Sequence, residues 1–479
     1  MNSTFGKLKK SITYLLVVLT PVLMTTIHSF IVGHNLFLGR PHNSDEFCYW
    51  RVLYSFEKCG FDFASTCGLV GSDAKIGPLG EHGLATIFAW GPSIVIGPLG
   101  EHTLFIWNII ILSISLLVFV ILVNPSFRTS LIVILLIVGN GVILEQWYSH
   151  MMELPCMAII IIGISLTIKY NQTMQNRYFI FLIGIVAYAS MMRICYIVLL
   201  LPALIDFCKT KKIGAICLSI ITYLLFFGGI RVFQQLYMKT SESFLSNMES
   251  GDGLTLLLDN IKKNMTNYFS LNSGTPVEVG QRYFQVCLII LLIIVAIIKC
   301  KNKSAYLAQA VSLSGLIFMM IVLYDVSDWR DVRTTMPLAL GISIWFAYQM
   351  EEELISKLIK GVFILVSLIF LFRYAPYKYV ENHPDDRYME YSVDSEWMAQ
   401  LSDEKYIICL YNTDIDNIAK FEMYKNIPAK VGILSTDDIN KVEENNNIKY
   451  VLTSEHSLYS EEYLVNYSED YGYLFKIAD

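Results

Sequence analysis

The chain has 479 residues, of which 54% are hydrophobic and only 16% are charged, and its formal net charge is −6. Soluble domains carry about 25% charged residues. A charged share this low, together with repeated long apolar runs, excludes an ordinary soluble protein and indicates a polytopic membrane protein. The acidic balance also argues against nucleic acid as a partner, because nucleic-acid binding requires a basic surface.

Apolar runs recur over the first three-quarters of the chain and predict about eleven transmembrane helices. The first run follows three lysines, is longer than the apolar region of a signal peptide and has no small-residue cleavage site, so we expect a retained signal anchor. Several runs are shorter than the roughly 20 residues that cross a bilayer without tilt. The candidate spans are residues 12–32, 103–123, 130–144, 151–168, 178–191, 194–208, 213–230, 285–299, 305–323, 335–350 and 357–372.

The runs 178–191 and 194–208 can be two spans or one kinked helix. Counted as two, they place the basic loops on the N-terminal side of the membrane, which is the positive-inside pattern. We therefore expect a multi-pass protein of the plasma membrane with a cytoplasmic N-terminus and an extracytoplasmic C-terminus. The many Asn and Lys residues suggest an AT-rich genome, which is consistent with a bacterium, so the membrane that we expect is a bacterial inner membrane. The basic residues on the N-terminal side are Lys7, Lys9, Lys10, Arg128, Lys169, Arg177, Lys209, Lys211, Lys212, Lys299, Lys301, Lys303, Lys357 and Lys360.

The composition changes at about Arg373, which divides the chain into a transmembrane domain, 1–372, and a tail, 373–479. In the tail, apolar segments such as 406–411 and 448–452 alternate with polar segments of helical spacing. This alternation predicts a small α/β domain on the extracytoplasmic side. The tail has no Gly-rich phosphate loop, so we do not expect a nucleotide site.

The first outer loop, 33–102, contains an internal repeat, since residues 76–82 and 96–102 both read IGPLGEH. Pro and Gly interrupt any continuous helix here, so we expect short helices lying at the membrane interface. The repeat is either a local duplication without chemistry or a site at which Glu81 or His82 lines an acceptor pocket. Two Glu-His pairs could also bind a metal, but neighbouring Glu and His are weak evidence for one.

Two adjacent carboxylates, Asp45 and Glu46, follow the first span. In a solvated loop they would be an ordinary acidic segment. At the membrane boundary beside a substrate, one can act as a general base while the other holds a cation or accepts a hydrogen bond. The polar loops whose residues could take part in a reaction all fall on this outer face. This favours an enzyme over a transporter, which would have polar residues at the midplane of the membrane.

A second group of candidates precedes the fourth span. Trp147 and His150 lie beside acidic residues and suit a platform for a sugar ring, but they equally suit an aromatic belt at the membrane interface. Glu153 opens an apolar helix, where a buried acid requires a partner, and this favours a substrate-binding role.

Three arginines are candidates for phosphate binding. Arg330 and Arg333 are three residues apart, share one helical face and can hold a phosphate bidentately, although Asp328 and Asp331 could neutralise them instead. Arg193 lies in an apolar setting between two short spans. It is either a structural ion-pair partner or a second phosphate ligand.

The order of these motifs resembles the GT-C superfamily of integral-membrane glycosyltransferases, which includes protein O-mannosyltransferases and the aminoarabinose transferases of lipid A. The resemblance covers about residues 1–372. The motifs that carry it are Asp45-Glu46, the Gly-Pro-rich segment 76–102, Glu-Leu-Pro at 153–155, the short spans around Arg193 and the Arg-x-x-Arg-x-x-x-Pro of 330–337.

The resemblance implies transfer of a sugar from a polyprenyl-phosphate donor to a glycan, lipid or protein acceptor at the outer face of the membrane. Asp45 would deprotonate the acceptor hydroxyl, and Arg330 and Arg333 would stabilise the leaving phosphate. Some members of the superfamily use a divalent cation and others do not, and no ligand set in this sequence requires one.

Two other hypotheses belong to different classes. A transporter, flippase or polymerase of lipid-linked glycans would need charged residues at mid-span depth, and Arg193 is the only good candidate. A lipid-modifying enzyme with a catalytic tail would need a nucleophile and a metal cluster after residue 373, where the candidate residues are too scattered to form one.

Overall fold

The computed structural model describes most of the helical core and most of the C-terminal sheet. Three of the expected spans, 213–230, 305–323 and 357–372, lie wholly or largely outside the described residues, so the count of about eleven spans stays a prediction. The described residues are 2–41, 44–64, 83–138, 147, 149–209, 253–270, 276–300, 321–322, 336–349, 401–412, 425–468 and 472–477, with isolated positions in 217–232 and 361–368.

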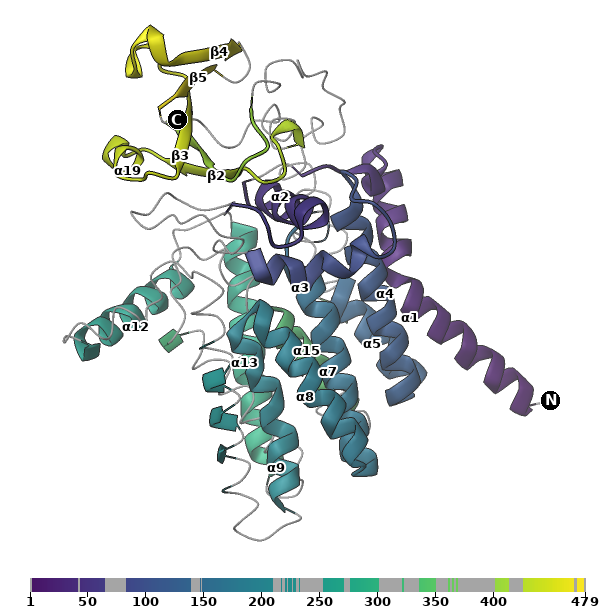
Figure 1. Ribbon diagram of the computed structural model, residues 1–479. Helices are drawn as coiled ribbons and strands as arrows, with labels where there is room; N and C mark the ends of the chain where they lie inside the picture. The colour runs from purple at the N-terminus through teal and green to yellow at the C-terminus, as the bar shows by residue number, and fades with distance from the viewer. Residues whose placement is uncertain are drawn as a thin grey trace.

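Three helices are long and apolar enough to cross a membrane: α1 (Asn2–Val32), α4 (Thr103–Val123) and α7 (Glu153–Thr173). They form a bundle with further apolar helices that run alongside them (Figure 1). The other described helices of this region are α5 (Phe127–Val138), α8 (Asn176–Met192), the 3-10 helix η2 (Ile194–Leu200), α9 (Leu201–Lys209), α12 (Gly253–Phe269), α13 (Pro276–Cys300) and α15 (Met336–Gln349).

Helix α7 is the centre of the bundle and is buried almost all round. A helix that is apolar on every face is stable only when neighbours cover every face, and α7 packs against α4, α8 and α15. It comes close to α15 at Gly341, where an added Cβ would overlap Cγ2 of Ile160. Glycine at 341 therefore permits this close helix crossing.

The chain reverses direction at Arg193. Ile185 of α8 and Leu199 of η2 both lie within 3.6 Å of the position that a Cβ on Gly163 would occupy. In one continuous helix these two residues would be about 21 Å apart along the axis. The segments 178–191 and 194–208 are therefore two antiparallel segments, as the charge distribution of the loops predicts.

The two ends of the bundle differ in charge. Phe105 and His150 are in ring contact, with centroids 6.3 Å apart, so α4 and α7 begin at the same end. The hydroxyl of Tyr14 donates to Asn124 Oδ1 at 2.7 Å, which places the part of α1 around Tyr14 beside the far end of α4. Lys10, Arg128, Lys169 and Arg177 all belong to helix segments at that far end.

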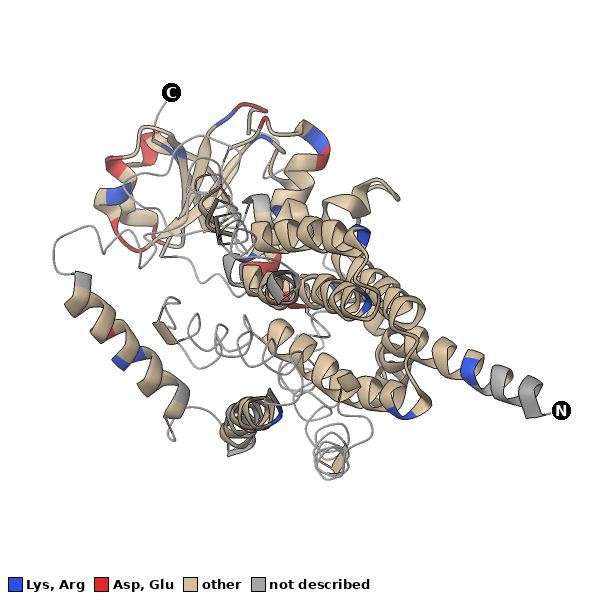
Figure 2. Cartoon of the chain, turned by 90° about the horizontal axis from the view of Figure 1, so that it is seen from below, with Lys and Arg blue, Asp and Glu red and all other residues tan. Residues whose placement is uncertain are grey.

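The end where α4 and α7 begin is covered by α2 (Ser44–Cys59) and α3 (Gly83–Ile94), and the C-terminal sheet lies beyond α2 (Figure 1). Among the described residues, positions occupied by charged residues are sparse along the helices of the bundle and frequent around the sheet (Figure 2). A bundle with basic residues at the end away from the sheet is consistent with the expected orientation.

The tail forms a mixed five-stranded sheet in the order β2-β1-β3-β5-β4. Strands β1, β2 and β3 are parallel, and β5 runs antiparallel to both β3 and β4. This confirms the expected strands near 406–411 and 448–452. The elements are β1 (Ile407–Tyr411), β2 (Gly432–Thr436), α19 (Ile439–Glu443), β3 (Ile448–Thr453), β4 (Leu464–Ser468) and β5 (Gly472–Lys476).

The two faces of the sheet have different neighbours. Leu410, Leu452 and Leu474 belong to the large buried cluster that continues into the helical bundle. Cys409 and Val451 point to the opposite face and pack in a smaller cluster with Val442 of α19. Because side chains alternate along a strand, one face of the sheet docks on the bundle and the other is turned away from it.

Candidate functional site

The candidate site lies where α2 crosses the end of the bundle beneath the sheet. Asp45 and Glu46 occupy the first turn of α2. Acidic side chains are stabilised in the first turn of a helix by the helix dipole. Successive helical positions differ in direction by about 100°, so the two adjacent carboxylates face different surroundings.

Glu46 is fully buried and is bound to the segment that leads into α7. Its Oε1 accepts a hydrogen bond from the backbone N–H of His150 at 3.1 Å. Its Oε2 lies 3.4 Å from Nδ1 of the His150 ring, which is itself 1% exposed. Both carboxylate oxygens of Glu46 therefore face protein groups, and this residue holds α2 against the start of α7.

Asp45 is only partly buried. Of the two adjacent acidic residues it is the less buried. The two adjacent carboxylates therefore differ in burial, with Glu46 fully buried and Asp45 partly buried.

Glu153 and Arg193 form an ion pair at the same end of the bundle. Glu153 is the first residue of α7, and Arg193 lies at the reversal between α8 and η2. Arg193 Nη2 is 2.9 Å from Glu153 Oε1, and the two side chains are 18% and 7% exposed. Glu153 has in Arg193 the partner that a buried acid requires, and a role of Arg193 in phosphate binding stays a prediction.

Trp147 and His150 lie in the core. Trp147 is fully buried, and its Nε1–H donates to Oγ1 of Thr25 on α1 at 3.2 Å. A stacking platform needs an exposed ring face, and neither side chain has one. The structure therefore assigns both residues to packing beneath the site instead of to an exposed sugar platform.

The second copy of the repeat ties three parts of the chain together. Glu101 lies 2.8 Å from Arg40 Nε and 2.5 Å from Lys425 Nζ of the tail. Partial burial acts to raise the pKa of Glu101, but the hydrogen bond from Lys425 and the charge of Arg40 outweigh it and lower the pKa. Trp50 Nε1 donates to the carbonyl of Gly100 at 3.2 Å, so this copy also contacts α2. The described copy therefore has a structural role.

A residue that the sequence did not indicate, Arg51, fixes the sheet to α2. Its guanidinium is fully buried and donates to the backbone carbonyls of Ile427, at 2.7 Å, and Val431, at 3.1 Å. It also donates to the carbonyl of Pro428. A charged residue inside the aromatic-rich segment 47–56 was the available signal, but its partners are distant in sequence.

Four predicted site residues, Glu81, His82, Arg330 and Arg333, lie outside the described residues. In the part of the chain that the structure describes, no group of three or more His, Cys, Asp or Glu side chains is arranged to hold a metal ion. The predicted site residues that the structure places at this end of the bundle are Asp45, Glu46, His150, Glu153 and Arg193.

No protein-family model matches the chain, and no curated protein matches it. Crystal structures of an oligosaccharyltransferase from Archaeoglobus fulgidus are distantly similar. The form tethered to an acceptor peptide has a TM-score of 0.48 at 10% identity, over 94% of this chain and 70% of that chain. The apo form has the same TM-score and coverage at 9% identity. The complex with zinc and sulfate has a TM-score of 0.47 at 11% identity, over 92% of this chain and 68% of that chain.

Proposed function

We propose that this protein is a membrane glycosyltransferase. It transfers a sugar from a polyprenyl-phosphate-linked donor to a hydroxyl group of a glycan, lipid or protein acceptor at the extracytoplasmic face. The observation that carries the proposal is the difference in burial between the adjacent residues Asp45 and Glu46. A partly exposed carboxylate stands in the first turn of α2, beside a neighbour that is buried and held by His150.

The reaction that suits this arrangement is an in-line displacement. A carboxylate oxygen of Asp45 takes the proton of the acceptor hydroxyl while the hydroxyl oxygen of the acceptor attacks the anomeric carbon of the donor sugar. The bond from the anomeric carbon to the phosphate oxygen breaks, and the phosphate keeps the bonding electrons. Arg330 and Arg333, which precede α15, are the groups that we assign to the leaving phosphate.

Contacts with the helical bundle and with the C-terminal sheet hold the helix that carries Asp45 in place. The Glu46–His150 contact holds the start of α2 against the start of α7, and Arg51 fixes the middle of α2 to the sheet. The Glu153–Arg193 pair holds the start of α7 at the same end. A general base needs such fixed placement, because small displacements of a reacting group reduce the rate strongly.

The experiment that tests this function is transfer of a labelled sugar from a polyprenyl-phosphate donor in membranes that contain the protein or the Asp45→Asn variant. Loss of a general base lowers the rate by roughly 10²–10⁴-fold, so we expect the variant to transfer sugar at least about a hundredfold more slowly than the wild type. Asp62→Asn is the matched control, because Asp62 follows α2 but pairs with Lys405 of the tail.

Two outcomes would contradict the proposal. Equal transfer by the wild type and Asp45→Asn at equal protein level would remove Asp45 from the reaction. Movement of a fluorescent lipid-linked glycan across proteoliposomes without any transfer would replace the enzyme by the transporter or flippase hypothesis.

A further inference from the structure

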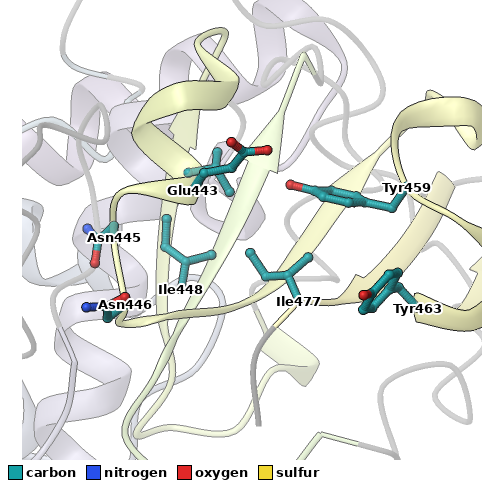
Figure 3. A pocket seen from close by; sticks show the side chains of 8 residues that line it. Glu443, Asn445, Asn446, Ile448, Tyr459, Tyr463 and Ile477 are labelled. Carbon is teal, nitrogen blue, oxygen red and sulfur yellow. The ribbon is translucent and has the colours of Figure 1, made fainter.

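The face of the sheet that is turned away from the bundle carries a pocket. Its volume is about 320 Å³, and its lining comes from α19, the turn that follows it, β3, the loop between β3 and β4, and the end of the chain after β5. Figure 3 shows the carboxylate of Glu443 and the hydroxyl of Tyr459 pointing toward one another, with Ile448 and Ile477 beside them. The pocket thus combines an apolar floor with two polar groups above it.

The hydroxyl of Tyr459 is buried and has no hydrogen-bond partner among the described residues. Burial and the nearby charge of Glu443 raise the pKa of Tyr459 to about 12, so the phenol keeps its proton. A neutral phenol can donate one hydrogen bond and accept others, whereas a carboxylate only accepts. A buried polar group without a partner calls for an explanation, and a ligand hydroxyl in this pocket supplies one.

A band of aromatic rings continues from the pocket across the same face. It consists of Tyr459, Phe475, Tyr473, Tyr467 and His456. Tyr459 and Phe475 have ring centroids 5.5 Å apart, and Phe475 and Tyr473 follow at 6.3 Å. Tyr467 stands directly opposite Tyr473 across the β4–β5 pair, at 4.6 Å, and the His456 ring is 4.7 Å from Tyr473.

The outer part of this aromatic band is open to solvent. Tyr467 is 49% exposed, and Tyr463 at the edge of the pocket is 45% exposed. Rings this exposed contribute little to a core but give rigid, flat surfaces with polar edges. A pyranose ring matches such a surface, because its C–H face packs on an aromatic ring while its hydroxyls bind neighbouring polar groups.

The charge of this face restricts the ligand further. Glu443 lines the pocket, and Glu461 and Glu462 lie next to Tyr463 and are exposed. Like charges at short range repel, so the surface disfavours phosphates, nucleotides and acidic sugars. It favours neutral sugars or amino sugars, whose hydroxyl and ammonium groups donate hydrogen bonds to carboxylates.

We infer that the outer face of the C-terminal sheet is a carbohydrate-binding site for neutral or amino-sugar oligosaccharides. One ring occupies the pocket between Glu443 and Tyr459, and the following rings lie along the aromatic band. The inference goes beyond the proposed transfer reaction, because binding at this face requires neither the lipid-linked donor nor Asp45.

The test is direct binding to the full chain in detergent micelles. Saturation-transfer NMR and calorimetric titration are performed with cellohexaose, mannohexaose, chitohexaose and its deacetylated form as probes. We expect at least one of them to bind, and we expect Tyr459→Phe and Glu443→Gln each to weaken that binding by about tenfold, as loss of a single hydrogen bond does. Tyr467→Ala should remove saturation transfer to the rings outside the pocket.

Matched controls separate this site from the rest of the protein. Glu444→Gln changes the neighbouring exposed acid, which does not line the pocket, and should leave binding unchanged. Asp45→Asn should also bind normally, so a failure of the transferase proposal is distinguishable from a failure here. Tyr459→Phe keeps the aromatic ring, and an unchanged unfolding temperature shows that the sheet is intact. Absence of binding by all four probes, or binding that both pocket variants leave intact, overturns the assignment.

Discussion

The carboxylate of Glu46 on α2 accepts a hydrogen bond from the backbone N–H of His150, 104 residues further along the chain, at 3.1 Å. This contact joins the helix that carries Asp45 to the segment that opens the central helix of the bundle. Because both partners are buried, the bond is shielded from water. It fixes the first turn of α2 against the segment that precedes α7. In the reaction that we propose, Glu46 is therefore a positioning residue for Asp45.

Replacing Glu46 should therefore affect stability more than chemistry. Glu46→Gln keeps a carbonyl oxygen for the His150 N–H, so we expect transfer within about tenfold of wild type with an unchanged pH profile. Glu46→Ala leaves a buried N–H without its acceptor, which costs about 1–3 kcal/mol, and we expect a lower unfolding temperature in detergent. A loss of transfer in Glu46→Gln as large as in Asp45→Asn would show that Glu46 takes part in the reaction itself.

The Glu153–Arg193 pair should behave as a coupled unit. Removal of one member leaves a buried charge without its partner, and such losses cost about 3–5 kcal/mol. We expect Glu153→Gln and Arg193→Gln each to lower the unfolding temperature strongly, and the double variant to be less unstable than the sum of the two. A double-mutant cycle measured by thermal unfolding checks this coupling. Additive effects would mean that Arg193 acts elsewhere, for example as a ligand of the donor phosphate.

The parts of the fold that depend on local pattern could be predicted from sequence. The span 103–123 coincides with α4, because a continuous apolar run ends at polar residues on both sides. The strand near 448–452 is β3, which is one residue longer. Both follow from hydrophobic patterning, which acts over neighbouring residues.

The site could be predicted only in part, because its geometry depends on contacts between distant segments. The sequence marks Asp45 and Glu46 as a pair but contains no sign that one is buried and the other partly exposed. The burial of Trp147 depends on its contact with Thr25, 122 residues away. The role of Arg51 depends on carbonyls about 376 residues away. Tertiary contacts of this kind leave no periodic trace in the sequence.

Arg51 should control the docking of the C-terminal sheet. In Arg51→Met the carbonyls of Ile427 and Val431 lose their buried donor, and each unsatisfied group costs about 1–3 kcal/mol. We expect the segment 425–431 to exchange amide hydrogens faster and the tail to be cleaved sooner by protease, while the helical bundle stays protected. Arg177→Met, at an exposed position of α8, is the matched control. Equal protection of the tail in both variants would show that Arg51 does not hold the sheet.

The attachment of the tail should also weaken in acid through Glu101. The Lys425 and Arg40 contacts hold the pKa of Glu101 below its ordinary value of 4.5, against the opposing effect of partial burial. A carboxyl whose pKa is lower in the folded state stabilises that state above its unfolded pKa, and the stabilisation is lost as the pH falls through the folded pKa. We therefore expect hydrogen exchange around Lys425 to rise as the pH is lowered below about 4.5, with rates corrected for the intrinsic effect of pH. Glu101→Gln, which cannot ionise, should show faster exchange at neutral pH and a flatter pH dependence, whereas Glu444→Gln should follow the wild type. A wild-type pH profile in Glu101→Gln would assign the acid sensitivity of this attachment to another carboxylate.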